Sequence, residues 1–239
     1  MIYMNIKLES PSCAECQARL NNVFCTLSDK QLTELSVEKS CNFYKKGQLV
    51  FFEGNRPTGL FCISKGKIKI YQIGIEGKEQ IIRLAKDGDI IGYRSLISGE
   101  MYSASASVIE DATICFLPRK IFFDLLQTNS ELSTRMMKLL SHDLRAAEKR
   151  ITGLAQKPVR ERLAETILML KEFYGLDKDN LTIKANLSRE DIANIVGTAT
   201  ETAIRILSEF RSEKLIELTG KKIQVLNHDM LVKAANVFD

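Results

Sequence analysis

Short β-branched and aromatic segments alternate with glycines between about Cys41 and Leu117. Segments of this composition favour β-strands, and glycines beside Lys, Asp or Asn favour the tight turns between them. The predicted strands are Leu49–Glu53, Leu60–Ser64, Lys67–Gln72, Glu79–Leu84, Ile90–Tyr93, Ser103–Val108 and Thr113–Leu117. The glycines are Gly47, Gly54, Gly66, Gly77, Gly88, Gly92 and Gly99. Many short strands with regular turns indicate a closed β domain, a barrel or a jelly roll.

The sequence becomes helical after Pro118. Arg119–Gln127 forms a short helix, and a long helix begins near Asn129 or Ser130, because either side chain can cap its first turn. Apolar and small residues then recur in alternating steps of three and four, which places them on one side of the helix. These residues are Met137, Leu140, Leu144, Ala147, Ile151 and Leu154. The stripe either packs on its own domain or forms the seam of a homodimer, and the small Ala147 favours the dimer by allowing close approach.

A second domain follows the interruption at Gln156, Lys157 and Pro158, since proline removes a backbone donor and restricts the residue before it. Its first helix, Val159–Tyr174, has apolar residues at core spacing, and Gly175 ends it.

The segment from Leu187 to Leu226 predicts a winged helix-turn-helix. Ser188 is an N-cap for a helix at Arg189–Val196, and Gly197 supplies the backbone freedom for a tight turn. A second helix covers Thr200–Ser212. The β segments Leu215–Leu218 and Lys222–Leu226 then flank Thr219-Gly220-Lys221, which is typical of a hairpin with a basic tip.

The outward residues of the second helix are candidates for reading DNA. Arg205 can donate two hydrogen bonds to guanine, and Glu201 can accept one from cytosine. Ser188 and Arg189 are placed to bind phosphates at a helix N-terminus. The full candidate set is Ser188, Arg189, Thr198, Thr200, Glu201, Ile204, Arg205, Ser208 and Lys221. The alternative interpretation of Glu201 and Arg205 is an ordinary ion pair on a solvated helix face.

Composition limits the other classes of function. The chain has 34 basic and 30 acidic residues, for a net charge of +4, so a DNA-binding surface requires local clustering. Met1–Leu8 lacks the features of a signal peptide, and no stretch approaches the ~18 apolar residues of a membrane helix. We therefore expect a cytoplasmic protein without a membrane partner. His142 and His228 have no nucleophile pattern near them, and no phosphate-binding loop occurs, so we do not expect an enzyme.

A ligand-binding signalling module is the remaining rival. In that case the C-terminal helices would bind a protein rather than DNA, and binding to random duplex would respond weakly to salt.

Motifs in both halves of the chain resemble the CRP/FNR family of bacterial transcription regulators. The motifs of the first half are Lys46–Gly47, Phe52–Gly54, Leu60–Ile63, Gly66–Lys69, Gly88–Gly92 and Leu117–Pro118. Those of the second half are Ser188–Ala193 and Glu201–Leu207. The resemblance implies a cyclic-nucleotide-binding-type β-roll, a dimerisation helix and a winged helix-turn-helix. It also implies base reading by Glu201 and Arg205, a palindromic DNA site, and RNA polymerase as a partner.

The predicted fold class is therefore α+β, with four parts. These are an N-terminal cysteine-containing arm (1–28), a β-roll or jelly-roll sensor domain (29–128), a dimerisation helix (129–157) and a winged helix-turn-helix domain (158–239).

The effector site departs from the family members that bind cyclic AMP. Those proteins hold the phosphate with an Arg-Ser pair and the ribose with a Glu. The comparable positions in this chain are Tyr102-Ser103 and Tyr93. The candidate effector pocket is Gly92, Tyr93, Tyr102 and Ser103. Without an arginine, a buried phosphate would keep an uncompensated charge, so we do not expect cyclic AMP as the ligand.

Another branch of the family binds a [4Fe-4S] cluster through cysteines, and the comparable residues here are Cys13, Cys16, Cys25 and Cys115. Thiolates with a C-x2-C start suit iron–sulfur or zinc. Cys25 follows Cys16 at a longer spacing than is familiar, so the alternative is a set of inert or redox-active thiols. Cys41 and Cys62 are expected in the core. Ala147 stands where the oxygen-sensing branch has an acidic residue on the dimer seam.

Overall fold

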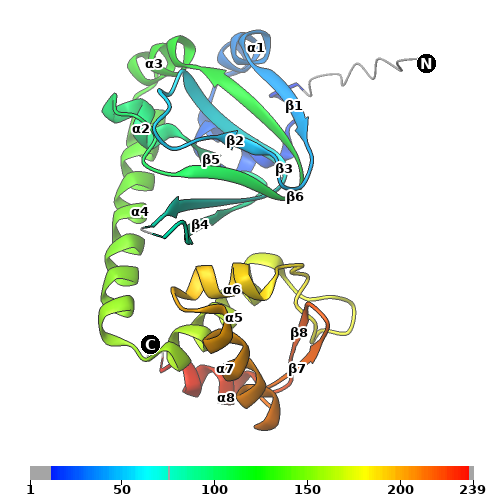
Figure 1. Ribbon diagram of the computed structural model, residues 1–239. Helices are drawn as coiled ribbons and strands as arrows, with labels where there is room; N and C mark the ends of the chain where they lie inside the picture. Colours follow the sequence, from blue (N-terminus) through cyan, green and yellow to red (C-terminus); the bar gives the residue numbers. More distant parts are fainter. Residues whose placement is uncertain (1–11, 75, 237–239) are drawn as a thin grey trace, which may run out of the picture. The chain divides into compact units, whose positions relative to one another are not determined.

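The computed structural model describes residues 12–74 and 76–236 (Figure 1). The chain divides into two compact units, the first comprising residues 1–73 and 82–144 and the second 74–81 and 145–239. Residues 1–11 of the expected arm, with the Met1–Leu8 segment, and residues 237–239 of the last expected domain lie outside the described residues.

The first unit is built on a mainly antiparallel sheet. Its strands are β1 (Ser40–Tyr44), β2 (Leu49–Phe51), β3 (Gly59–Ile73), β4 (Glu79–Ala85), β5 (Ile90–Ile91) and β6 (Ser105–Pro118). The order is β1-β6-β3-β4, with β2 also paired to β6 and β5 to β3. The apolar side chains of Ile63 and Ile114 lie opposite each other and are buried, which fixes this register. The predicted β-roll is confirmed.

Two predicted strand breaks do not occur. Leu60–Ser64 and Lys67–Gln72 are parts of the single strand β3, and Thr113–Leu117 and the predicted strand Ser103–Val108 from Ser105 onward belong to the single strand β6. The register of β3 on β6 shifts three times between Ile63 and Ile68, so bulges absorb the interruption that the sequence suggested. Tyr93, predicted to end a strand, instead begins a helix.

Helices and the arm cover the sheet of the first unit. They are the 3-10 segments η1 (Gln17–Asn21) and η2 (Val23–Thr26), and the α-helices α1 (Asp29–Glu38), α2 (Tyr93–Ser98), α3 (Arg119–Thr128) and the first part of α4 (Ser130–Gln156). Ser28 caps α1 in a reciprocal pair with Gln31. Phe24 of the arm, Leu60 of β3 and Phe122 of α3 meet in one buried cluster. The described part of the arm is therefore packed into the core.

The long helix α4 has two different apolar sides. Asn129 caps it, because its Oδ1 accepts a hydrogen bond of 2.9 Å from the Leu132 amide. Leu132 and Met136 are buried in the core cluster of the first unit, against which Leu140 is partly packed. The remaining side of the stripe is exposed: 60% for Met137, 62% for Leu144, 67% for Ile151 and 39% for Leu154. Ala147 is exposed among them.

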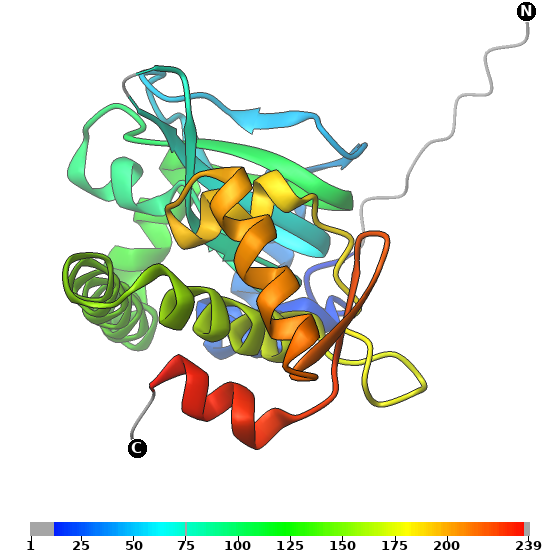
Figure 2. The same cartoon turned by 60° about the horizontal axis from the view of Figure 1, so that its bottom comes forward.

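The second unit is a three-helix core with a hairpin and a final helix. Its elements are α5 (Val159–Tyr174), α6 (Arg189–Val196), α7 (Thr200–Ser212), β7 (Ile216–Thr219), β8 (Lys222–Val225) and α8 (His228–Ala235). Leu163, Ile167, Ile192, Leu207 and Phe210 are buried in it. Figure 2 shows α7 in orange with the β7–β8 hairpin beside its carboxyl end. Within residues 12–74 and 76–236, no helix combines the length and the apolar character needed to span a membrane.

Candidate nucleic-acid interface

The start of α6 is fixed by a capping box. Ser188 Oγ accepts a hydrogen bond of 2.9 Å from the Asp191 amide, and Asp191 Oδ2 accepts one of 3.1 Å from the Ser188 amide. The Ser188 hydroxyl also donates to the same carboxylate, at 2.7 Å. The side chain of Ser188, expected at a phosphate, is therefore engaged within α6, and its effect is to set where the helix begins.

The turn between α6 and α7 depends on Gly197. Its φ of +76° lies in the left-handed region, and its amide donates to the Ala193 carbonyl at 2.8 Å, closing α6. Thr198 and Thr200 follow the turn and are half-buried. The turn thus sets the direction in which α7 leaves.

The outer face of α7 carries the other candidate base-reading residues. Ala203, Ile206, Leu207 and Phe210 are buried and hold the helix on the domain core. The remaining side is exposed and includes Glu201, Ile204, Arg205 and Ser208. Ile204, which is 45% exposed, adds an apolar contact surface between the two charged residues. The α7 helix therefore presents acceptor, apolar and donor groups side by side.

Arg205 pairs with Glu209, one turn further along α7, rather than with Glu201. Its side chain is 64% exposed, so the ion pair is solvated and contributes little to stability. An exposed guanidinium of this kind can leave its carboxylate for a better acceptor at low cost. Glu201 remains exposed at the amino end of the same helix.

Arg189 links α6 to the hairpin. Its Nη2 donates a hydrogen bond of 2.8 Å to the Gly220 carbonyl at the hairpin tip, and burial lowers the pKa of its guanidinium. Its Nη1 is buried and has no hydrogen-bond partner among the described residues. Sequence reasoning placed Arg189 at a phosphate and missed its contact with the hairpin, which depends on tertiary structure. Lys221, next to Gly220, is exposed.

Aromatic side chains occupy the expected effector region of the β-roll. The Tyr102 ring stacks on Phe51 with centroids 4.1 Å apart, and the Tyr102 hydroxyl donates to the Gly59 carbonyl at 3.4 Å. A Cβ placed on Gly92 would lie 3.3 Å from the Tyr102 ring, so that ring packs closely on Gly92. Ser103 is exposed, and its carbonyl accepts from Gln72 at 2.7 Å.

Tyr93, expected at the ribose-binding position, contacts other side chains of the protein. Its hydroxyl donates to Asp143 of α4, and Arg83 Nη1 lies 3.3 Å from it. Burial raises the pKa of Tyr93 to about 12, the Arg83 charge lowers it, and Asp143 raises it. The four expected effector residues therefore lie near one another, but the side chains of Tyr93 and Tyr102 contact protein groups.

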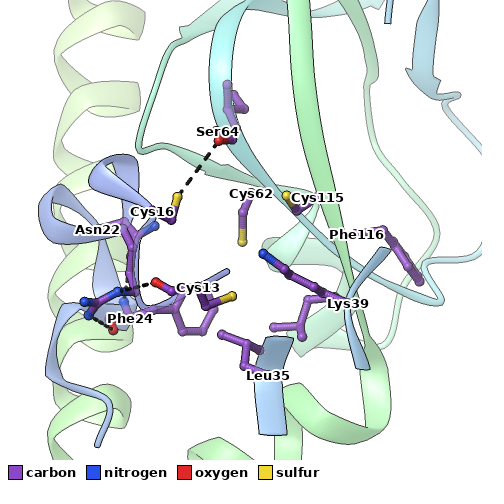
Figure 3. Close-up of a pocket in the computed structure, with 13 residues that line it drawn as sticks. Cys13, Cys16, Asn22, Phe24, Leu35, Lys39, Cys62, Ser64, Cys115 and Phe116 are labelled. Atoms are coloured by element: carbon purple, nitrogen blue, oxygen red, sulfur yellow. Dashed lines mark hydrogen bonds between the residues drawn. The ribbon is translucent and has the colours of Figure 1, made fainter. Parts of the chain in front are cut away.

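A pocket of the first unit is lined by four cysteines, Cys13, Cys16, Cys62 and Cys115 (Figure 3). Lys39 and Ser64 also line it, and Cys16 Sγ lies 3.9 Å from the Ser64 hydroxyl. Burial raises the pKa of the Cys62 thiol to about 12, Cys13 and Cys16 raise it further, and the Lys39 charge lowers it. The N-terminal C-x2-C pair, Cys13 and Cys16, thus lies beside Cys62 of β3 and Cys115 of β6. The family resemblance had grouped this pair with Cys115.

The expected cluster ligands do not form one set. Cys115 is joined to Cys41 by a disulfide, because the two residues are paired across β1 and β6. Cys25 lies in η2 and is not among the residues that line the pocket. In the described part of the chain, no three His, Cys, Asp or Glu residues are arranged to hold a metal. The residues present here do not fit a [4Fe-4S] cluster. Cys62, expected in the core, packs partly buried against the core cluster of the first unit, and Cys41, also expected there, is half-buried and bonded to Cys115.

A β-roll joined by a long helix to a winged helix-turn-helix defines a DNA-binding transcription regulator. The cyclic nucleotide-binding domain model matches residues 41–129, and the Crp-like helix-turn-helix domain model matches residues 161–234. The chain belongs to the CRP/FNR family of transcription regulators.

Two curated relatives match along most of their length. The fumarate and nitrate reduction regulatory protein of Vibrio cholerae is 30% identical over 238 residues, which cover 97% of this chain and 94% of the relative. Electron transport regulator A of Shewanella oneidensis is 30% identical, over 92% of this chain and 88% of its own. Both relatives are regulators by name.

Solved structures show the same fold. FixK2 from Bradyrhizobium japonicum matches with a TM-score of 0.75 and 21% identity, over 84% of this chain and 99% of that one. A CRP/FNR-family regulator from Thermus thermophilus matches with a TM-score of 0.70 and 24% identity, over 83% of this chain and 99% of that one.

Proposed function

We propose that this regulator binds DNA as a homodimer on a two-fold symmetric site and reads base edges with α7. The observation that carries the proposal is the exposed face of α7. Glu201 and Arg205 stand on a helix whose opposite side is anchored by Ala203, Leu207 and Phe210. A rigid helix that presents a donor and an acceptor at its amino end suits the major groove.

The roles within this interface follow from side-chain chemistry. Arg205 exchanges Glu209 for guanine O6 and N7, and Glu201 accepts from a cytosine amine. Thr198, Thr200, Ile204 and Ser208 contact the flanking sugar, methyl and phosphate groups. Lys221 binds a phosphate from the hairpin tip, Arg189 offers its unpartnered Nη1 to another, and Ser188 positions the amino end of α6.

The exposed stripe of α4 supports the homodimer. Met137, Leu144 and Ile151 are large apolar side chains that are at least 60% exposed in one copy, at coiled-coil spacing. Pairing α4 with its copy would bury them, with Leu140, Leu154 and the small Ala147 completing the seam. A two-fold protein then requires a two-fold DNA site.

The signal acts on the first unit and differs from cyclic AMP. Tyr102 stands where the phosphate-binding arginine of the cyclic AMP branch is expected, and its ring stacks on Phe51. Because this position holds no arginine, the charge of a buried phosphate would stay uncompensated. We further propose that the regulator works in the cytoplasm and acts through RNA polymerase, in keeping with relatives that are named as regulators.

Selection of bound duplexes from a random library tests the proposal. We expect an inverted repeat with half-site centres about 10 base pairs apart, and two chains per duplex in sedimentation. Affinity for random duplex should fall steeply with salt, as several phosphate contacts require. A library without enrichment, one chain per duplex, or a flat response to salt would favour a protein-binding module instead.

A further inference from the structure

Cys115 has a cysteine on each side of it in the β-roll sheet. Strand β6 lies between β1 and β3, and the register places both Cys41 of β1 and Cys62 of β3 opposite Cys115. Side chains directly opposite in antiparallel strands share a face, with Cβ atoms ~4.5–5.5 Å apart. Cys41, Cys115 and Cys62 therefore form a row across the strands, which we call the cysteine row.

Cys115 is bonded to one of its two neighbours. The disulfide joins it to Cys41, and Cys62 is a free thiol. Figure 3 shows the sulfur atoms of Cys62 and Cys115 at the same pocket. A disulfide needs Cβ atoms ~3.5–4.5 Å apart, which is close to the cross-strand spacing. A bond between Cys62 and Cys115 would draw β3 slightly closer to β6 at this pair.

We propose that the cysteine row is a thiol–disulfide exchange site, in which Cys115 bonds either to Cys41 or to Cys62. In the exchange, the Cys62 thiolate attacks Cys115 Sγ and the bond to Cys41 breaks. Cys41 leaves as a thiolate and takes up the proton that Cys62 gave up. The number of disulfides is unchanged, so the step needs no oxidant or reductant. Burial raises the pKa of the Cys62 thiol to about 12 and so keeps the attacking thiolate scarce, and the positive charge of Lys39 in the same pocket offsets part of that rise.

The setting of the row favours exchange over a purely structural disulfide. A regulator of chromosomal DNA works where thiols are kept reduced, and the few disulfides found there are mainly catalytic or redox-sensing. Exchange also changes which strands are tied together, because β6 is linked to β1 in one state and to β3 in the other. This chemistry belongs to the β-roll and stands without the proposed reading of DNA by α7.

Disulfide mapping of the full-length protein tests the proposal. The protein is equilibrated in a buffer of reduced and oxidised glutathione, its free thiols are blocked at acid pH, and it is digested with trypsin without reduction. Lys45, Lys65 and Arg119 end tryptic peptides that separate Cys41, Cys62 and Cys115. Oxidised glutathione supplies the two-electron oxidation where a disulfide forms from two thiols, and is itself reduced to two thiols.

The variant Cys41→Ser should form the Cys62–Cys115 linked peptide, and Cys62→Ser should keep only the Cys41–Cys115 peptide. Cys25→Ser is the matched control, since Cys25 does not line the pocket, and it should give the wild-type pattern. If folded Cys41→Ser is recovered with both Cys62 and Cys115 alkylated, the two thiols do not form a disulfide and the proposal is overturned. If near-UV circular dichroism shows that Cys41→Ser is unfolded, the wild type decides, because the proposal requires a minor Cys62–Cys115 peptide there and its absence is contradictory.

Discussion

The hydroxyl of Tyr93 donates a hydrogen bond to Oδ2 of Asp143. Tyr93 begins α2 in the β-roll, and Asp143 lies on the long helix α4, so this bond ties the two together. Arg83 of β4 completes the contact, with its Nη1 3.3 Å from the Tyr93 oxygen and 3.4 Å from Asp143 Oδ2. Tyr93, at the position that resembles the ribose-binding residue of the cyclic AMP branch, thus holds the β-roll against α4.

This buried phenol should make stability depend on alkaline pH. The pKa of Tyr93 is raised to about 12, above its ordinary value of 10.0. Below pH 10 both states keep the proton; between 10 and 12 the unfolded chain loses it first, so stability falls as pH rises. Between about pH 9 and pH 11, the free energy of unfolding of the wild type should therefore decrease by about 1 kcal/mol more than that of Tyr93→Phe. Denaturant unfolding at each pH measures this. Parallel pH profiles for the two proteins would contradict the assignment.

The exposed stripe of α4 should respond to a single charge. Leu144→Glu places a carboxylate in the proposed seam, where both copies would bury it, so the dimer dissociation constant should rise at least ~100-fold. His142→Glu adds the same group to an exposed residue on the opposite side of the helix and should leave the dimer intact. Sedimentation velocity over a range of concentrations separates the cases, and equal behaviour of the two variants would exclude α4 as the seam.

Lys221 should contribute affinity without sequence preference. Lys221→Ala removes the proposed phosphate contact at the hairpin tip, so binding should weaken equally on selected and random duplexes. The slope of log affinity against log salt should become about one unit shallower. Lys233→Ala, which removes the same charge from an exposed residue of α8, should change neither quantity. An unchanged salt slope for Lys221→Ala would remove the hairpin tip from the interface.

Cyclic AMP should not stabilise the protein. A ligand at about one hundred times its Kd adds about 2.7 kcal/mol to folding, which raises the Tm by several degrees. With Tyr102 stacked on Phe51 and packed on Gly92, we expect no shift at millimolar cyclic AMP in a thermal melt. A concentration-dependent rise in Tm would show that the ring moves aside and that the pocket binds the nucleotide.

The sequence predicts the helices α3 to α7 closely, because their signals are local, whereas α1, α2 and α8 were not predicted. Caps and glycines mark the ends of α6 at Arg189 and Val196, and the apolar spacing marks α7. The strands were less predictable. A bulge in β3 resembles the end of one strand and the start of another when only the residues of that strand are considered.

The cysteine row and the hairpin contact could not be predicted in this way. The pairing of Cys115 with Cys41 and Cys62 depends on the register of three strands that are distant in sequence. Arg189 contacts Gly220 across 31 positions of the chain. Side-chain type gave the candidates in both cases, but only the tertiary structure decided their partners.

The most direct test of DNA reading by α7 is the affinity of Arg205→Ala for a selected duplex relative to random duplex. A bidentate arginine–guanine contact contributes about 1–3 kcal/mol to discrimination, so the preference should fall at least ~10-fold while binding to random duplex changes little. Lys214→Ala, an equal loss of charge just beyond the carboxyl end of α7, should keep the wild-type preference. An Arg205→Ala protein that still prefers the selected duplex as strongly as the wild type would contradict the account.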